Sequence, residues 1–110
     1  MWLFTNIGFF SVVQKPKTNF LTVRARVASD LDNLRQTYMP GLSATTDKGG
    51  HDYPHRATIS HAEFAAGLAK MGKDISYENF KDEVASRMGV RREAVYSQVW
   101  RVLRGLETES

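Results

Sequence analysis

The sequence predicts an α+β fold: a small antiparallel sheet of three to four strands with helices on one face, in the order ββαβα, followed by a C-terminal helical pair. Two observations predict it. Residues 2–27 are rich in aromatic and β-branched side chains, which favour strands, whereas residues 60–106 carry apolar side chains at helical spacing. Because the strands are few and mixed with helices, we expect an antiparallel sheet and not a doubly wound parallel one.

The chain of 110 residues is expected to form a single domain over residues 1–110. Within that domain, residues 1–75 are expected to hold the ββαβα core, and residues 76–106 the C-terminal helix pair.

Three stretches are expected to form the strands. In residues 2–13, Gly8 interrupts an aromatic and β-branched run and predicts a break between two short strands. Residues 20–27 alternate strictly and are expected to pair in a hairpin with residues 9–13. Residues 53–59 can form a further strand. In the second stretch one face is expected to carry Leu21, Val23, Ala25 and Val27, and the other Phe20, Thr22, Arg24 and Arg26.

The first helix is expected to begin at Ser29, whose hydroxyl can cap it. Asp30 and Asp32 then fall in its first turn, where the helix dipole favours negative charge. Pro40-Gly41 is expected to end this helix, and residues 41–52 to form a loop. A loop of this length in a small domain is usually functional or mobile.

Three further helices are expected in the second half of the chain. Ser60 and Glu63 match a capping box, in which a hydroxyl and a carboxylate each satisfy a free backbone amide. Ser76 is expected to cap the next helix, and Gly89 to close it. The last helix is expected from about Arg91 to Leu106, with one apolar face. That face carries Val95, Val99, Val102, Leu103 and Leu106.

Composition and charge restrict the class of protein. The chain has no cysteine, which excludes disulfides, thiolate metal sites and cysteine nucleophiles. No apolar stretch reaches the roughly 20 residues of a membrane span, and the N-terminus lacks the basic segment of a signal peptide. We therefore expect a cytoplasmic protein with no membrane partner. The net charge of +3 permits an anionic partner without requiring one.

The last two helices resemble a helix-turn-helix, a DNA-binding motif. Ala85 is small where the two helices would cross, Gly89 lies in the turn, and Val95 would pack the second helix on the first. Gln98 departs from the motif, which expects an apolar residue there. An ordinary helical hairpin has the same features and is the alternative. The resemblance implies major-groove and phosphate contacts from Arg91, Arg92, Tyr96, Ser97 and Arg101.

The strand at residues 20–27 offers a second candidate nucleic-acid site. Arg24 and Arg26 share a side with Phe20, and the Phe9-Phe10 pair on the neighbouring strand must place one ring on that side. Arginines beside aromatic rings on an open sheet neutralise and stack single-stranded nucleic acids. The alternative is an ordinary solvated strand face.

His51, Asp52, His55 and His61 are candidate metal ligands or acid–base groups. In an extended chain His51 and His55 lie about 13 Å apart, too far to share one ion, whereas a tight turn at Tyr53-Pro54 would bring them together. The extended chain is the expectation, and with it no metal site and no cofactor. No serine, histidine and acid are tied together by spacing, and no phosphate-binding loop is present. We therefore expect no catalytic residue.

Tyr96 and Trp100 widen the apolar arc of the last helix to about 160° at 100° per residue. Either this helix is wedged between two elements, or the two rings form an exposed ledge. Exposed tryptophan and tyrosine side chains are common anchors for protein partners. The 41–52 loop is a further candidate for partner binding.

Residues 2–11 (WLFTNIGFFS), Asp52-Tyr53-Pro54 and residues 77–82 (YENFKD) together resemble a family of small bacterial proteins of unknown function. The resemblance runs over most of the chain. It implies no activity, substrate or catalytic residue.

The sequence therefore predicts a non-catalytic binding protein. The leading hypothesis is binding of DNA or RNA through the basic strand face, the C-terminal helices or both. The alternative is a protein-interaction module or inhibitor that uses Tyr96 and Trp100 or the 41–52 loop. The oligomeric state stays open. The candidate nucleic-acid contacts are Arg24, Arg26, Arg91, Arg92, Tyr96, Ser97 and Arg101.

Overall fold

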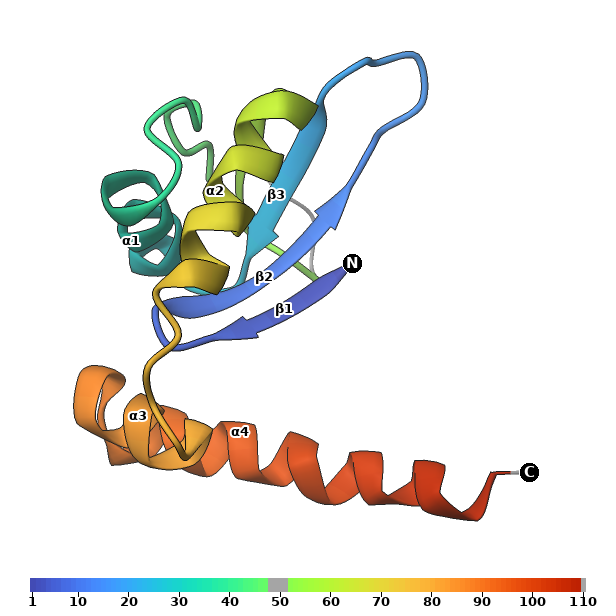
Figure 1. The fold of residues 1–110 in the computed structure, drawn as a ribbon. Coiled ribbons are helices and arrows are strands. Elements are labelled where there is room, and N and C mark those ends of the chain that lie inside the picture. The colour runs from blue at the N-terminus through green and yellow to red at the C-terminus, as the bar shows by residue number, and fades with distance from the viewer. Residues whose placement is uncertain (48–51, 110) are drawn as a thin grey trace. The chain divides into compact units, whose positions relative to one another are not determined.

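The structure is a computed structural model that describes residues 1–47 and 52–109 (Figure 1). The chain divides after Ser76 into two compact units. Unit 1 holds the sheet and the first two helices, and unit 2 holds the remaining helices. In the described part of the chain, no helix has the length and hydrophobicity that crossing a membrane requires.

Unit 1 contains a four-stranded antiparallel sheet, as the sequence predicts, with the strands in the order β1-β2-β3-β4. The break predicted at Gly8 is the turn of the β1–β2 hairpin, where Thr5 lies opposite Gly8. The Thr5 hydroxyl closes this turn, since it accepts from the Gly8 N–H at 3.1 Å and donates to the Gly8 carbonyl at 2.7 Å. The strands are β1 (Trp2–Thr5), β2 (Gly8–Val13), β3 (Leu21–Ala25) and β4 (His55–Ile59).

Helices α1 (Ala28–Thr37) and α2 (His61–Lys73) cover one face of this sheet (Figure 1). The alternation predicted for residues 20–27 holds within β3 and turns its apolar side chains toward these helices. Val27 is the exception: it is exposed, because β3 ends at Ala25 and the chain turns into α1. The core combines Phe10, Val12, Leu21, Val23, Ala25, Ala57 and Ile59 of the sheet with Leu31, Leu34 and Phe64 of the helices.

Two polar side chains fasten α1 to the β1–β2 hairpin. Asp30 is only 2% exposed, and its Oδ2 accepts from the Phe9 N–H at 3.0 Å. Asn33 donates to the Ile7 carbonyl at 3.1 Å. A Cβ at Gly8 would lie 2.7 Å from the Asp30 side chain, so this close approach requires glycine. The cap predicted at Ser29 is wrong: α1 begins at Ala28, without a side-chain cap.

The start of α2 follows the sequence prediction in part: the Ser60 cap is confirmed, but the Glu63 carboxylate bonds to the Ser60 hydroxyl and not to a backbone amide. The Ser60 hydroxyl accepts from the Glu63 N–H at 3.1 Å, so Ser60 is the N-cap. The Glu63 carboxylate in turn accepts from the Ser60 hydroxyl at 3.1 Å. Further along α2, a Cβ at Gly67 would lie 2.6 Å from the Met39 side chain, so the absence of a side chain lets α2 approach the chain that follows α1.

Unit 2 consists of α3 (Phe80–Met88), α4 (Val90–Leu103) and a short 3₁₀ helix, η1 (Arg104–Thr108). The N-cap of α3 is Asn79, whose side chain accepts from the Asp82 N–H at 2.9 Å, so the cap predicted at Ser76 is wrong. Gly89 joins the two helices with φ 97° and ψ 159°. Its place in the turn agrees with the sequence prediction.

The packing of α4 on α3 differs from the prediction. Tyr96 is the buried residue of α4, and its ring stacks on Phe80 at 5.9 Å between ring centres. Val95, which was expected to pack the second helix on the first, is exposed. Of the other residues of the predicted apolar face, Val102, Leu103 and Leu106 are exposed as well.

Candidate functional site

The face of the sheet opposite α1 and α2 carries a row of side chains that crosses all four strands. Trp2 of β1 lies opposite Ser11 of β2, Ser11 opposite Arg24 of β3, and Arg24 opposite Arg56 of β4. Each of these residues alternates with core residues on its own strand, so the row points away from the core. We call the face that bears this row, together with Phe4 and Phe9, the outer sheet face.

The β1–β2 end of the outer sheet face is aromatic. Phe4 stacks on Phe9 with ring centres 4.5 Å apart, and Trp2 meets Phe9 edge-on at 6.0 Å. Trp2 is 67% exposed. An exposed indole, held in place by a neighbouring ring, can stack against a planar ligand.

The β3–β4 end of the outer sheet face is cationic. Arg24 donates to the Ser11 hydroxyl at 2.7 Å, and its guanidinium lies 4.6 Å from the centre of the Tyr53 ring. The Arg26 guanidinium lies 5.0 Å from the same ring centre. Arg56 donates to the Tyr53 carbonyl at 3.3 Å. Tyr53 therefore contacts three arginines: Arg24 and Arg26 through its buried ring, and Arg56 through its backbone carbonyl.

In the part of the chain that the structure describes, these arginines have no acidic partner. Within residues 1–47 and 52–109, the ion pairs join other residues, and the buried Nε of Arg24 has no hydrogen-bond partner. Like charges directly opposite each other on neighbouring strands, as Arg24 and Arg56 are, destabilise a sheet. An anion bound between them would relieve this repulsion.

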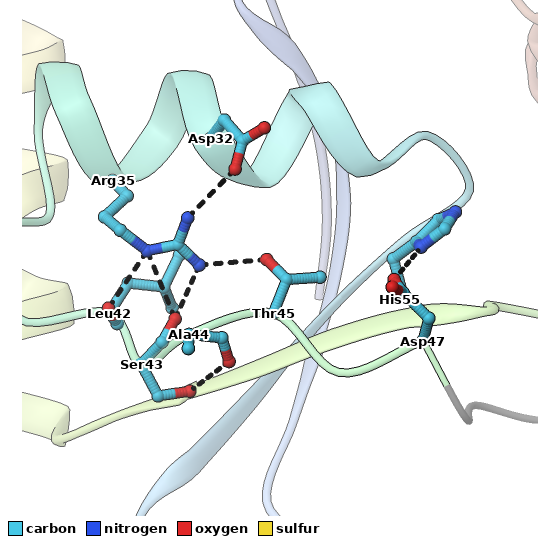
Figure 2. Close-up of polar contacts among 8 residues, drawn as sticks. All are labelled: Asp32, Arg35, Leu42, Ser43, Ala44, Thr45, Asp47 and His55. Carbon is cyan, nitrogen blue, oxygen red and sulfur yellow. Dashed lines mark hydrogen bonds and ion pairs between the residues drawn. The ribbon is translucent and has the colours of Figure 1, made fainter.

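The segment after α1 is held by Arg35 (Figure 2). The guanidinium of Arg35 donates to the carbonyls of Leu42 and Ser43 and to the Thr45 hydroxyl, and it forms an ion pair with Asp32 at 3.1 Å. The N–H donors of Arg35 are therefore mostly bonded within the protein, and few remain for a ligand.

The same segment runs beside β4. The Ser43 N–H donates to the Thr58 carbonyl at 2.8 Å, and Thr46 and Arg56 exchange two backbone hydrogen bonds. These bonds satisfy the outer edge of β4. Within the expected 41–52 loop, residues 42–47 are therefore held by backbone and side-chain contacts, and residues 48–51 lie outside the described part.

The two described histidines, His55 and His61, have separate partners. His55 Nδ1 contacts Asp47 Oδ1 at 2.7 Å (Figure 2), and His61 Nε2 contacts Gln14 Oε1 at 3.0 Å. His51 lies outside the described residues. Among the residues that the structure describes, no three histidine, aspartate or glutamate side chains are grouped as a metal ion would require.

The residues proposed as a major-groove surface do not form one exposed face in unit 2. Tyr96 is 7% exposed and packs on Phe80, so it is removed from the candidate base contacts and from the candidate partner anchors. The guanidinium of Arg92 lies 6.0 Å from the Tyr96 ring, and Ser97 donates to Glu93 at 2.6 Å. Arg91 and Arg101 are exposed.

Trp100, unlike Tyr96, is exposed to solvent. It is 52% exposed, with Lys81 Nζ 4.7 Å and the Arg104 guanidinium 5.8 Å from its ring centre. The two rings therefore do not form one ledge: Tyr96 packs inward and Trp100 is left at the surface of unit 2.

Sequence reasoning found Arg24 and Arg26, and it placed one ring of the Phe9-Phe10 pair on this face, which the structure shows to be Phe9. It missed the rest of the outer sheet face. Trp2, Arg56 and Tyr53 join it through the strand register and through the bend before β4, which no local pattern specifies. Phe20, expected beside Arg24, lies before the first residue of β3.

The chain matches no family model, no curated protein and no solved structure.

Proposed function

We propose that this protein is a non-catalytic protein that binds single-stranded nucleic acid on the outer sheet face. One observation carries the proposal: an exposed tryptophan and two arginines stand in a single row across four strands, on the face that α1 and α2 leave uncovered. The proposed binding site does not include the helix pair of unit 2.

The two ends of the row suit the two parts of a single-stranded nucleic acid, its bases and its phosphates. A base has a flat apolar face that can stack on Trp2, and base–aromatic stacking contributes about 1–3 kcal/mol per base. The phosphates carry negative charge that Arg24, Arg26 and Arg56 can neutralise, with the planar guanidinium that suits phosphate.

The dimensions of the sheet agree with this division. Neighbouring strands lie about 4.8 Å apart, so the row from β1 to β4 spans about 14 Å. The four-stranded sheets of known RNA-binding domains stack two or three bases over such a face. In a duplex the base faces are already stacked on each other, so the aromatic end favours a single strand.

The experiment is fluorescence anisotropy with labelled single-stranded RNA, single-stranded DNA and duplex DNA, at low and moderate salt. We expect salt-sensitive binding of single strands, weaker binding of the duplex, and a loss of about 5- to 150-fold for Trp2→Ala. Trp100→Ala is the matched control, because it removes an exposed indole from unit 2. Equal loss in both variants, or no binding of single strands at low salt, would contradict the proposal.

A second function, protein binding by unit 2, is favoured by the exposure of Trp100 between two cationic side chains. Tryptophan at a protein surface is enriched among residues that dominate binding energy. This function predicts the reverse pattern in a pull-down from cell extract. The Trp100→Ala variant should fail to retain a protein that the parent chain retains, and the Trp2→Ala variant should still retain it.

A further inference from the structure

The positive charge of the outer sheet face is gathered at one end. The members of this face on β1 and β2 are uncharged: Trp2, Phe4, Phe9 and Ser11. The cations follow on β3, in the turn after it and on β4: Arg24, Arg26 and Arg56. A ligand with evenly spread charge would be matched by cations along the whole row. The observed distribution therefore suits a ligand whose negative charge is concentrated at one point.

Two of these arginines occupy the closest kind of cross-strand position. Arg56 exchanges its backbone hydrogen bonds with Thr46, on the side of β4 away from β3. Arg24 and Arg56 are therefore a non-hydrogen-bonded pair, whose Cα atoms lie about 4.5 Å apart and whose side chains are closer than in the other kind of pair. In residues 1–47 and 52–109, no ion pair reaches either arginine. The sheet thus holds two like charges close together without a counter-charge.

Neutral groups hold the arginines in place. The hydroxyl of Ser11, which is 1% exposed, accepts from Arg24, and the buried ring of Tyr53 lies against Arg24 and Arg26. The Tyr53 carbonyl accepts from Arg56. These contacts position the guanidiniums and leave their charge uncompensated. A site that is ordered in advance loses less conformational entropy when its ligand binds.

The chemistry of phosphate groups distinguishes two ligands for this site. An internal phosphodiester of a nucleic acid carries one negative charge and two free oxygens. A terminal phosphate monoester has three free oxygens and a charge of about −1.5 to −2 at pH 7. Each guanidinium can donate two parallel hydrogen bonds to a phosphate. Two adjacent guanidiniums therefore match the charge and the oxygens of a monoester better than those of a diester.

We propose that Arg24 and Arg56, with Arg26 beside them, bind the terminal phosphate monoester of a single-stranded nucleic acid. This inference rests on the proposed function and adds a preference for strands with a phosphorylated end. A strand anchored in this way leads its first bases toward Trp2, because the row runs about 14 Å from β4 to β1. When both ends of a strand are hydroxyls, the same arginines contact internal phosphodiesters and the strand binds more weakly.

Fluorescence anisotropy with strands of one sequence tests the preference. One strand carries a 5′-phosphate, one a 3′-phosphate, and one has hydroxyls at both ends, with the label away from the end that is varied. We expect one of the phosphorylated strands to bind about tenfold more tightly than the hydroxyl-ended strand, and the comparison identifies the end. A hydroxyl-ended strand two nucleotides longer is the ligand control, because it adds similar charge as diesters. It should gain less than about twofold.

Variants of the chain test the location. Arg56→Gln should reduce the preference to less than about twofold. Arg26→Gln is a second variant that should weaken the preference without disturbing the sheet, because Arg26 is exposed and follows β3. Lys73→Gln is the matched control. It removes one positive charge from α2, which covers the opposite face of the sheet, and should keep the full preference (Figure 1).

The possible outcomes separate this inference from the proposed function. Equal binding of phosphorylated and hydroxyl-ended strands would overturn the terminal-phosphate site and leave single-strand binding in place. The site would also be overturned if the longer control strand gained as much as the phosphorylated one, or if Lys73→Gln lost the preference as fully as Arg56→Gln. Failure of every strand to bind at low salt would contradict the proposed function itself, and this inference with it.

Discussion

The guanidinium of Arg24 lies 4.6 Å from the centre of the Tyr53 ring, and that of Arg26 lies 5.0 Å from the same centre. Tyr53 precedes β4 and is itself buried, so its ring is a fixed surface for two cations that the chain brings from β3 and the turn after it. A cation over an aromatic face is attracted by the ring quadrupole, which offsets part of the repulsion between the two arginines.

Arg24→Lys should weaken nucleic-acid binding although it preserves the charge. A lysine ammonium cannot both lie flat over Tyr53 and donate a fork of hydrogen bonds, as the guanidinium of Arg24 can. We expect a loss of about 1 kcal/mol, or roughly fivefold, in titrations with single-stranded RNA. Arg91→Lys in unit 2 is the control and should bind like the parent. Unchanged binding by Arg24→Lys would show that this residue contributes only net charge.

The salt dependence of binding should report how many phosphates the arginines of the outer sheet face neutralise. Neutralising three phosphates of a single strand gives a slope of log K against log salt of about −2. Arg56→Gln should make the slope shallower by about 0.7, because one phosphate contact is lost. Lys73→Gln, at the end of α2, should leave the slope unchanged. A steeper slope that responds equally to both variants would point to diffuse attraction by the whole chain.

Asp30 should be important for stability and not for binding. Its carboxylate is buried and accepts from the Phe9 N–H at 3.0 Å, so Asp30→Ala leaves a partly buried donor without this partner. The expected loss of unfolding free energy is about 1–3 kcal/mol. Asp32→Ala is the control: Asp32 is exposed and pairs with Arg35, so its loss should stay below about 1 kcal/mol. Urea unfolding measures both, and equal losses would contradict a special role for Asp30.

How far the sequence predicts this fold depends on the range of the interactions involved. The alternation in β3 and the cap at Ser60 are local, and both were predicted. The start of α1 was not predicted: the helix begins at Ala28 without a side-chain cap, and Asp30 of its first turn bonds to Phe9, 21 residues away, a contact that no local pattern shows.

The same distinction explains the candidate site. Arg24 and Arg26 were found from one strand, whereas the row from Trp2 to Arg56 exists only once three strand pairings are in register. In unit 2, Tyr96 was assigned to a surface because helical spacing does not reveal that its ring stacks on Phe80. Packing between aromatic side chains of two helices outweighed the apolar stripe that begins at Val95.

Gly89→Ala should destabilise unit 2 selectively. Gly89 has φ 97° and ψ 159°, a region of backbone conformation that is nearly restricted to glycine, although a Cβ there would meet no neighbouring atom within 4 Å. The penalty therefore comes from the backbone alone and should be about 1–3 kcal/mol. Gly105→Ala is the matched control, since a Cβ at Gly105 also meets no atom within 4 Å and its φ is not positive. Hydrogen exchange should show faster opening of α3 and α4 in Gly89→Ala only, with the amides of unit 1 unchanged. If Gly105→Ala accelerates exchange as much, the effect would follow from adding a methyl group to unit 2 and not from the turn conformation.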